Sequence, residues 1–85
     1  MPTIHRAGVL RFVIYLNDHA PAHVHAVHPD GEVKIELALA DRPPRLAWVR
    51  GRMTDAEVRR ALAEVAREQG MMWNAWRRIH EGDAP

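Results

Sequence analysis

The sequence contains no cysteine and no serine, and these two absences exclude several kinds of chemistry at once. Without cysteine there is no disulfide, no thiolate nucleophile and no cysteine-based zinc site. Without serine there is no serine-hydrolase mechanism, and the only aliphatic hydroxyl groups belong to Thr3 and Thr54. Any chemistry in this chain therefore rests on histidine, on carboxylates or on basic residues.

Long hydrophobic runs are also missing. The longest strongly apolar run extends from Phe12 to Leu16, whereas a membrane-spanning helix needs roughly 20 apolar residues. The first residues lack the apolar core of a secretory signal peptide. We therefore expect a protein with no membrane association that works in the cytoplasm.

The chain has 85 residues, which predicts a single small domain, residues 1–85, with one core. Such a domain leaves little room for a deep active site, so a shallow groove or a homodimer interface is the expected working surface. The formal net charge of +1 does not by itself indicate nucleic-acid binding.

Arginine is concentrated in residues 42–53, which contain no acidic residue. Because a guanidinium group matches the geometry of phosphate, Arg45, Arg50 and Arg52 are candidates for binding phosphate or RNA. A general preference for arginine codons explains the same run without any function.

Alternation of apolar and polar residues predicts strands in the first half of the chain. Residues 10–17 and 33–39 both place an apolar side chain at every second position. Residues 3–5, 23–28 and 46–50 are shorter candidates, and Pro29-Asp30-Gly31 is a strong turn signal. We expect a small antiparallel β-meander of three to five strands over about residues 3–50.

The second half, residues 54–81, is predicted to be helical. Thr54 and Glu57 have the spacing of a capping box, and apolar residues follow from Val58 at every third or fourth position. A straight helix of this length would measure about 40 Å, so we expect a bend or break near Gly70. The fold class is therefore α+β, with a C-terminal helical region packed on one face of the sheet.

The last part of this helical region carries large apolar side chains. Met72, Trp73 and Trp76 expose a wide apolar surface unless the sheet or a partner covers it. They are the candidate residues for an interface with a partner chain.

Histidine is unusually frequent, with six residues in the chain and four of them between His19 and His28. Residues two apart on a strand share a face, so His23 and His25 point the same way. His19 or Asp18, from the preceding loop, can supply a third group, and two or three histidines with an open position are typical of a catalytic zinc site. His28 falls on the opposite face, next to the turn, and is expected at the surface.

Two other interpretations of His23 and His25 need no metal. The pair can act as general acid and base near neutral pH. Alternatively, both rings have a structural role, covering the sheet and forming hydrogen bonds with an aspartate or a backbone carbonyl group.

The stretch Asp18-His19-x-Pro21-x-His23-Val24-His25 closely resembles the signature of a family of small bacterial proteins, the domain-of-unknown-function family 4160. The family pattern is acidic-His-x-Pro-Pro-His-Val-His after an aromatic-rich strand, with a tryptophan near the end of a helical region, which Trp76 matches. Ala22 stands where the family usually has its second proline, which loosens the loop without removing a candidate ligand. The resemblance covers nearly the whole chain.

This resemblance indicates which family the chain is related to, but it says less about what the protein does. Genes of the family often lie beside a gene for another small protein, which implies an arrangement like a bacterial toxin–antitoxin pair.

Three functions remain open on these grounds. The first is a toxin–antitoxin-like module that binds a small protein partner and RNA, with His23 and His25 as the catalytic pair of a ribonuclease-like activity that requires no cofactor. The second is a protein that binds a zinc-like divalent ion, with metal-dependent hydrolysis as its enzymatic form. The third is a non-enzymatic interaction module that docks a partner through its helix.

Overall fold

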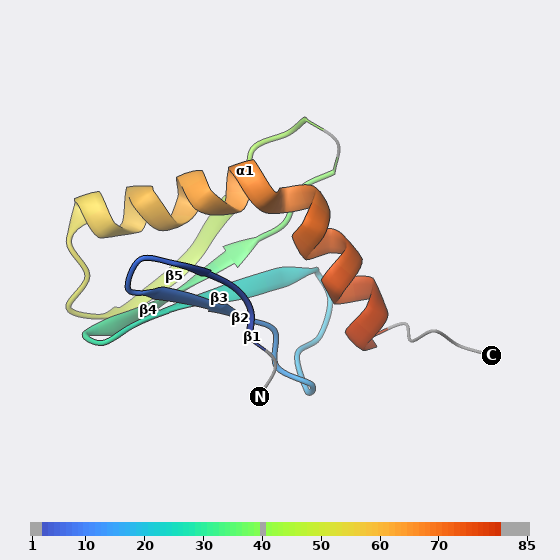
Figure 1. The fold of residues 1–85 in the computed structure, drawn as a ribbon, viewed down its shortest axis with the longest axis horizontal. Coiled ribbons are helices and arrows are strands. Elements are labelled where there is room, and N and C mark those ends of the chain that lie inside the picture. Colours follow the sequence, from blue (N-terminus) through green and yellow to red (C-terminus); the bar gives the residue numbers. More distant parts are fainter. Residues whose placement is uncertain (1–2, 40, 81–85) are drawn as a thin grey trace.

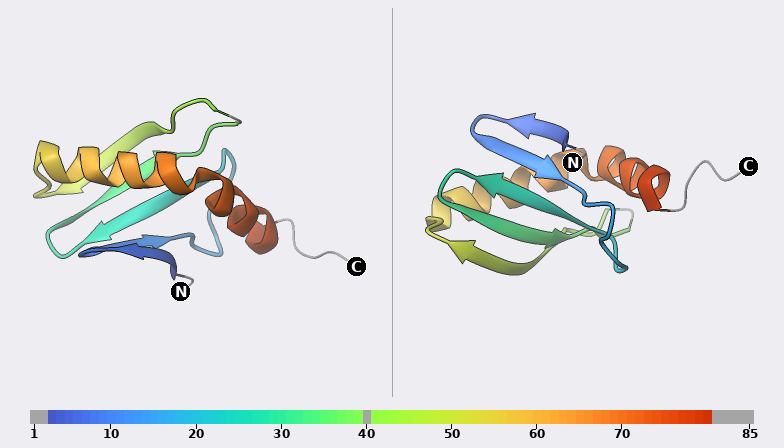
Figure 2. Two further views of the ribbon diagram at one scale, coloured as in Figure 1. Left: turned by 45° about the horizontal axis from the view of Figure 1, so that its top comes forward. Right: turned by 90° about the horizontal axis from the view of Figure 1, so that it is seen from below.

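The computed structural model describes residues 3–39 and 41–80. Within them the elements are β1 (Thr3–Ala7), β2 (Leu10–Val13), β3 (His23–His28), β4 (Gly31–Glu36), β5 (Arg45–Gly51) and α1 (Asp55–His80). The strands form one antiparallel sheet in the order β1-β2-β3-β4-β5, and α1 lies across one of its faces (Figure 1). The predicted α+β class and meander are thus confirmed, and the view from below in Figure 2 shows the sheet in front of the helix.

Two strands are shorter than the alternation predicts. β2 stops at Val13, because the Tyr15 N–H donates to Asp18 Oδ2 and the Asp18 N–H donates back to the Tyr15 carbonyl oxygen, which turns the chain. Leu16, expected to continue the strand, is 75% exposed. β4 stops at Glu36, although Leu37 stays buried and its N–H donates to the carbonyl oxygen of Ala22.

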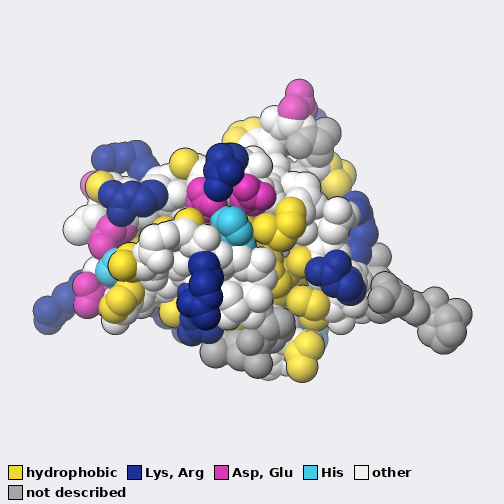
Figure 3. All heavy atoms as spheres, in the orientation of Figure 1, with side chains coloured by type: hydrophobic (Ala, Val, Ile, Leu, Met, Phe, Trp, Pro, Cys, Tyr) yellow, Lys and Arg dark blue, Asp and Glu magenta, His cyan; other side chains and the backbone are white. Residues whose placement is uncertain are grey.

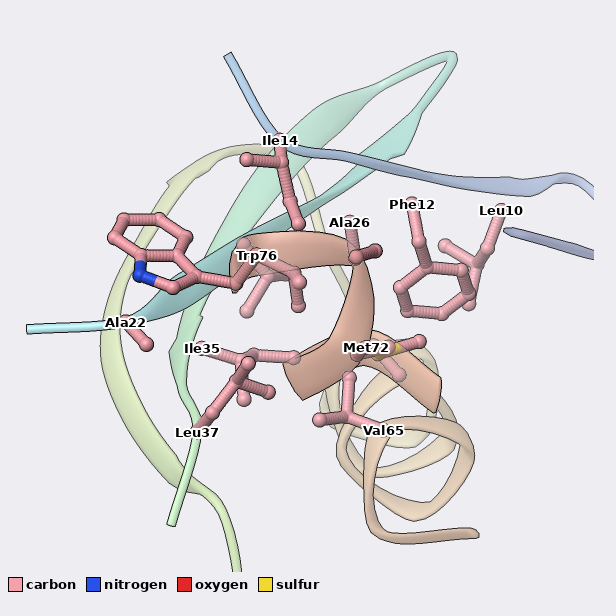
Figure 4. Close-up of a cluster of buried hydrophobic side chains, with 14 residues drawn as sticks. Leu10, Phe12, Ile14, Ala22, Ala26, Ile35, Leu37, Val65, Met72 and Trp76 are labelled. Carbon is pink, nitrogen blue, oxygen red and sulfur yellow. The ribbon is translucent and has the colours of Figure 1, made fainter. Parts of the chain in front are cut away.

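The core lies between the sheet and α1. The inward side chains of β2, β3 and β4 meet one stripe of the helix, and the buried cluster contains Leu10, Phe12, Ile14, Ala22, Val24, Ala26, Val33, Ile35, Leu37, Ala61, Val65, Met72, Ala75 and Trp76. Figure 4 shows Met72 among the side chains of the sheet and Trp76 turned towards Ala22. Burying this apolar surface fixes which face of each strand is turned towards the helix.

The helix α1 begins with the predicted capping box. The Thr54 N–H donates to Glu57 Oε1, and the Glu57 N–H donates to Thr54 Oγ1. The helix then kinks at Glu68, where φ is −107° and ψ is 17°, two residues before Gly70. The bend lets the second part of α1 pass beside the end of the sheet instead of projecting straight ahead (Figure 2). Residue 81, the expected last helical residue, lies outside the described residues.

The chain's own core covers most of the apolar surface on this helix that the sequence offered as a partner interface. Met72 is fully buried and Trp76 is 5% exposed, both in the chain's own core. Trp73 is partly buried, and its Nε1–H donates to the carbonyl oxygen of Ala38 over 2.7 Å. The kink brings all three side chains against the same chain, so no partner is needed to cover them. In the described part of the chain, no helix is long and apolar enough to cross a membrane.

Candidate functional site

The candidate site lies at the start of β3, on the face of the sheet that α1 leaves open. Val24 and Ala26 belong to the core under the helix, so His25 between them points to the opposite face. His23, at the first position of the strand, reaches the end of the sheet, where its ring centroid lies 5.2 Å from that of Trp76. His23 is 3% exposed and His25 is 7% exposed.

Both imidazoles point one ring nitrogen at the same carboxylate oxygen. Asp18 Oδ1 lies 3.3 Å from His23 Nε2 and 3.4 Å from His25 Nε2, which is also 3.4 Å from Asp18 Oδ2. The other oxygen, Oδ2, accepts the Tyr15 N–H over 2.9 Å, which fixes the orientation of the carboxylate. The three ligand atoms of Asp18, His23 and His25 lie within 4.8 Å of one another.

The second nitrogen of each ring faces away from Asp18. His23 Nδ1 lies 2.8 Å from the carbonyl oxygen of Pro21, and because a carbonyl only accepts, Nδ1 carries the proton and donates. His25 Nδ1 lies 2.8 Å from Glu32 Oε2, although the carboxylate sits off the N–H direction and leaves this buried nitrogen without a well-directed hydrogen bond. With Nδ1 protonated, the neutral ring of His23 presents its Nε2 lone pair to Asp18, whereas the neutral ring of His25 can carry its proton on Nε2 and donate it to Asp18.

These separations match those between the ligands of a small metal ion. Two ligand atoms bound about 2.0–2.1 Å from a tetrahedral ion lie roughly 3.3–3.4 Å apart. The two distances from Asp18 Oδ1 to the histidine nitrogens, 3.3 and 3.4 Å, have this length. Metal-binding histidines also characteristically donate their other ring N–H to a carbonyl or a carboxylate, as His23 does to Pro21.

The carboxylate of Asp18 stays ionised in this setting. Burial by itself would raise its pKa, but the hydrogen bond from the Tyr15 N–H and the nearby imidazoles of His23 and His25 outweigh burial. The pKa of Asp18 is therefore lowered from its ordinary value. Asp18 thus supplies a full negative charge at neutral pH between two nitrogen atoms.

Three further residues surround His25. The ring centroids of Tyr15 and Trp48 lie 4.7 Å and 5.8 Å from that of His25, and Glu32 approaches its Nδ1. Glu32 was not among the residues predicted for this site. Its position was available from the predicted turn, because the register that pairs His28 with Gly31 puts Glu32 opposite Val27, diagonal to His25 on the same face.

His19, the fourth predicted ligand, is not brought into the group. It is exposed in the loop, whereas the close set consists of Asp18, His23 and His25. The loop turns back at Asp18 to hold Tyr15, and this places the aspartate and not its neighbour against the sheet. The motif thus contributes one loop ligand to this group.

The three candidate arginines are all exposed, and they lie in different surroundings. Arg45 forms an ion pair with Glu36 over 2.6 Å. The Arg50 guanidinium lies 4.2 Å from the centre of the Trp48 ring. The Trp48 ring in turn lies beside His25, so Arg50 is separated from the histidine site by one side chain. Arg52 follows β5, and its N–H donates to the backbone oxygen of Asp30. The structure therefore does not gather them into one anion-binding pocket.

His28, expected at the surface, has a side chain only 8% exposed and a structural role. Its Nδ1 accepts the Asp30 N–H over 3.0 Å, so the proton of the neutral ring is on Nε2, which lies 2.7 Å from Glu57 Oε2. It therefore ties the β3–β4 hairpin to the capping box of α1, and both of its nitrogens have partners within the chain.

A second group, made of His5, Glu64 and Glu68, also brings three ligand atoms together. Arg67 already pairs with both carboxylates, at 2.6 Å from Glu64 and 2.9 Å from Glu68. Hydrogen bonds from Arg67 and from His5 lower the pKa of Glu64. A resident positive charge thus neutralises this group, which makes it a surface ion-pair network.

Comparison with known proteins supports the relationship indicated by the motif. No curated protein and no solved structure matches the chain. The family model described as Domain of unknown function (DUF4160) matches residues 10–77, which include β2, the loop with Asp18, the histidine strand and most of α1. The chain belongs to the DUF4160 family.

Proposed function

We propose that this protein binds one divalent transition-metal ion through Asp18, His23 and His25. The observation that carries the proposal is the convergence of two buried Nε2 atoms on Asp18 Oδ1, at 3.3 and 3.4 Å. The hydrogen bond from His23 Nδ1 to Pro21 supports it, because it leaves Nε2 free to act as a ligand.

A divalent cation suits the charges at this site, because the carboxylates of Asp18 and Glu32 both lie against its imidazoles. The hydrogen bond to Pro21 holds the proton of a neutral His23 on Nδ1, so its Nε2 lone pair faces the ionised carboxylate, and a proton or a metal ion on Nε2 removes that repulsion. A neutral His25 can instead donate its Nε2–H to Asp18. Protonating both rings would place two positive charges in rings whose centroids are 5.0 Å apart and which are almost fully buried. A single divalent ion satisfies both nitrogens and the carboxylate at once.

The donor set indicates the kind of ion. Imidazole nitrogen suits zinc, iron, nickel and copper, whereas calcium and magnesium prefer all-oxygen sites. Two histidines and one carboxylate leave at least one coordination position for water or substrate. An ion bound there would supply Lewis-acid chemistry and lower the pKa of a bound water. The protein's own part is to fix Asp18 through the Tyr15 N–H and to orient His23 through Pro21.

Calorimetric titration of tag-free, EDTA-treated protein with zinc chloride tests this proposal. We expect one zinc per chain and a melting temperature that rises with zinc, equivalent to about 2.7 kcal/mol of stabilisation at 100 times the dissociation constant. Asp18→Asn and His25→Ala should each abolish the response. Glu32→Gln, which removes the negative charge behind His25, should weaken binding about 10–100-fold.

His19→Ala is the matched control, because it removes an exposed histidine next to a ligand while leaving the close group intact. Its zinc affinity should equal that of the wild type. An unchanged wild-type melting temperature in saturating zinc and nickel would refute the proposal, as would binding lost in His19→Ala but kept in Asp18→Asn.

Acid–base cleavage of RNA by His23 and His25 has less support. A general base must come within about 3 Å of the proton it removes, and these two rings are 3% and 7% exposed. On the face seen in Figure 3, basic side chains alternate with acidic ones over α1 and do not form one patch.

The toxin–antitoxin-like role in the cytoplasm, with a small protein partner, is a separate proposal supported by the size of the chain and its exposed arginines. Its test is the growth of a bacterial host after induction of the wild type or of the His23→Ala/His25→Ala variant. Arrest by the wild type alone supports a toxin that acts through this site, whereas growth with both proteins counts against a stand-alone toxin.

A further inference from the structure

The strand β5 forms an edge of the sheet. It pairs with β4 along one side, and the strand order leaves its other side without a neighbouring strand in the described residues. Six of its seven residues are exposed, whereas four of the five residues of β1, at the opposite edge, are partly buried. An edge of this kind presents a row of unpaired backbone N–H and C=O groups to another chain.

The side chains of β5 do little to block such pairing. Its middle, Leu46 to Val49, is apolar and contains no proline, and Leu46 and Val49 are 41% and 40% exposed. The register shifts opposite Lys34 and Ile35, which bulges β5 at Ala47. Beyond this bulge, Trp48–Gly51 pairs regularly with β4, so the exposed edge includes a regular stretch.

The charged side chains of β5 and its flanks have one sign, although Glu32 and Glu36 of β4 lie opposite Arg50 and Arg45. Residues 42–53 contain four arginines and no acid, and Arg45 uses Glu36 as its partner. Arg50 stacks on Trp48, and neither Arg50 nor Arg52 forms an ion pair with any residue that the structure describes. A second copy of β5 would bring the same arginines and no acid to face them, whereas an acidic segment would be attracted.

We propose that the outer edge of β5 binds an acidic, extended segment of a partner protein, which adds to the sheet as a sixth strand. Backbone hydrogen bonds to the edge supply affinity, as in other cases of strand addition. Apolar residues at alternate positions of the segment lie beside Leu46 and Val49, while its carboxylates face Arg50 and Arg52. This surface does not depend on metal binding by Asp18, His23 and His25.

The proposal is tested by nuclear magnetic resonance with a synthetic probe. A peptide of about seven residues, an ordinary strand length, alternates glutamate and valine. We expect the backbone amide signals of β5 to shift and their hydrogen exchange to slow, with little change in β1. A control peptide with proline in place of valine has the same charge but lacks those N–H donors, so it should bind at least about tenfold more weakly.

The exposed pair Arg50 and Arg52 supplies the protein variant. Arg50→Glu/Arg52→Glu should bind the glutamate–valine peptide at least about tenfold more weakly and regain binding to a lysine–valine peptide, because like charges across an interface repel. Its melting temperature and the dispersion of its amide signals report whether it is folded.

Three results would overturn the proposal. One is the absence of any β5 shift at millimolar peptide. Another is equal binding of the proline control, which would mean charge attraction without strand addition. The third is occupation of the β5 edge by a different molecule. This would be seen as a dimer of the protein that dissociates in Arg50→Glu/Arg52→Glu, or as single-stranded RNA that binds the edge in preference to the peptide.

Discussion

The two faces of β3 use histidine in opposite ways. On the side that meets the helix, His28 accepts the Asp30 N–H and faces Glu57, so both of its nitrogens are used by the fold. On the open side, His23 and His25 direct their Nε2 atoms at Asp18, which has no proton to give. The same residue type on one strand therefore joins the hairpin to the helix on one face and, on the other, forms the site that we propose binds a metal ion.

The difference gives a way to distinguish a structural histidine from the proposed ligand histidines. Burial does not separate them, since the side chains of His25 and His28 are both 8% exposed. What separates them is what the ring nitrogens face: those of His28 face a backbone donor and a carboxylate of their own, whereas the Nε2 atoms of His23 and His25 converge on one carboxylate. Substitutions on the helix side should thus change stability regardless of zinc, and those on the open side should change the zinc response.

The largest expected effect is that of Trp76→Ala. Trp76 is 5% exposed in the core and packs against the ring of His23. Its removal should lower the free energy of unfolding by about 3–5 kcal/mol, measured by urea denaturation in EDTA. Trp76→Phe keeps most of the volume and should lose much less. A loss below about 1 kcal/mol for Trp76→Ala would show that this side chain is not part of the core.

The next largest loss of stability is expected from Gln69→Ala. This buried glutamine sits after the kink, where its Oε1 accepts the Ala38 N–H and its Nε2 donates to the Arg42 carbonyl oxygen. The substitution leaves those backbone groups unpartnered and should lower the free energy of unfolding by about 1–3 kcal/mol. Since the proposed zinc ligands lie elsewhere, any zinc-induced rise in melting temperature should match that of the wild type. A loss of the zinc response would mean that the loop after β4 supports the metal site.

The parts of this fold that were predictable from sequence are those set by local patterns. The alternation in residues 33–39 predicted strand β4, and the spacing of Thr54 and Glu57 predicted where the helix begins. Both features depend only on residues a few positions apart in the sequence. The end of β2 was not predictable in this way, since it depends on the Asp18 side chain taking the Tyr15 N–H. The burial of Met72 and Trp76 depends on how the kinked helix lies on the sheet.

In the candidate site, too, the features set by local sequence patterns were predictable and those set by the folding of the loop were not. Strand alternation predicted that His23 and His25 share a face, whereas the choice between Asp18 and His19 depends on how the loop folds back. Glu32 could have been found by counting back from the predicted turn, because it lies in the register of the hairpin. The direction of each ring nitrogen depends on partners such as the Pro21 carbonyl, which alternation does not reveal.

A smaller effect is expected from Glu57→Gln, seen in the pH dependence of stability. Hydrogen bonds from the Thr54 N–H and hydroxyl group lower the pKa of Glu57 below its ordinary 4.5. The folded state therefore binds protons less readily, so this stabilisation is complete above the unfolded pKa and is lost as pH falls through the folded one. Glu57→Gln should make the melting temperature less sensitive to acid below about pH 4.5. The same acid sensitivity in both proteins would contradict the capping role.

The smallest change in stability is expected from Asp18→Asn in metal-free protein. The asparagine Oδ1 can still accept the Tyr15 N–H, and its two Nδ2–H groups can donate to the two Nε2 atoms that now face a carboxylate. The free energy of unfolding in EDTA should therefore change by less than about 1 kcal/mol, while the stabilisation by zinc disappears. If the site were an ion pair between Asp18 and protonated histidines, the same substitution would leave buried charges unpaired and destabilise the metal-free protein by about 3–5 kcal/mol. Urea denaturation in EDTA at neutral pH thus decides between a site formed to hold a metal ion and one held together by its own charges.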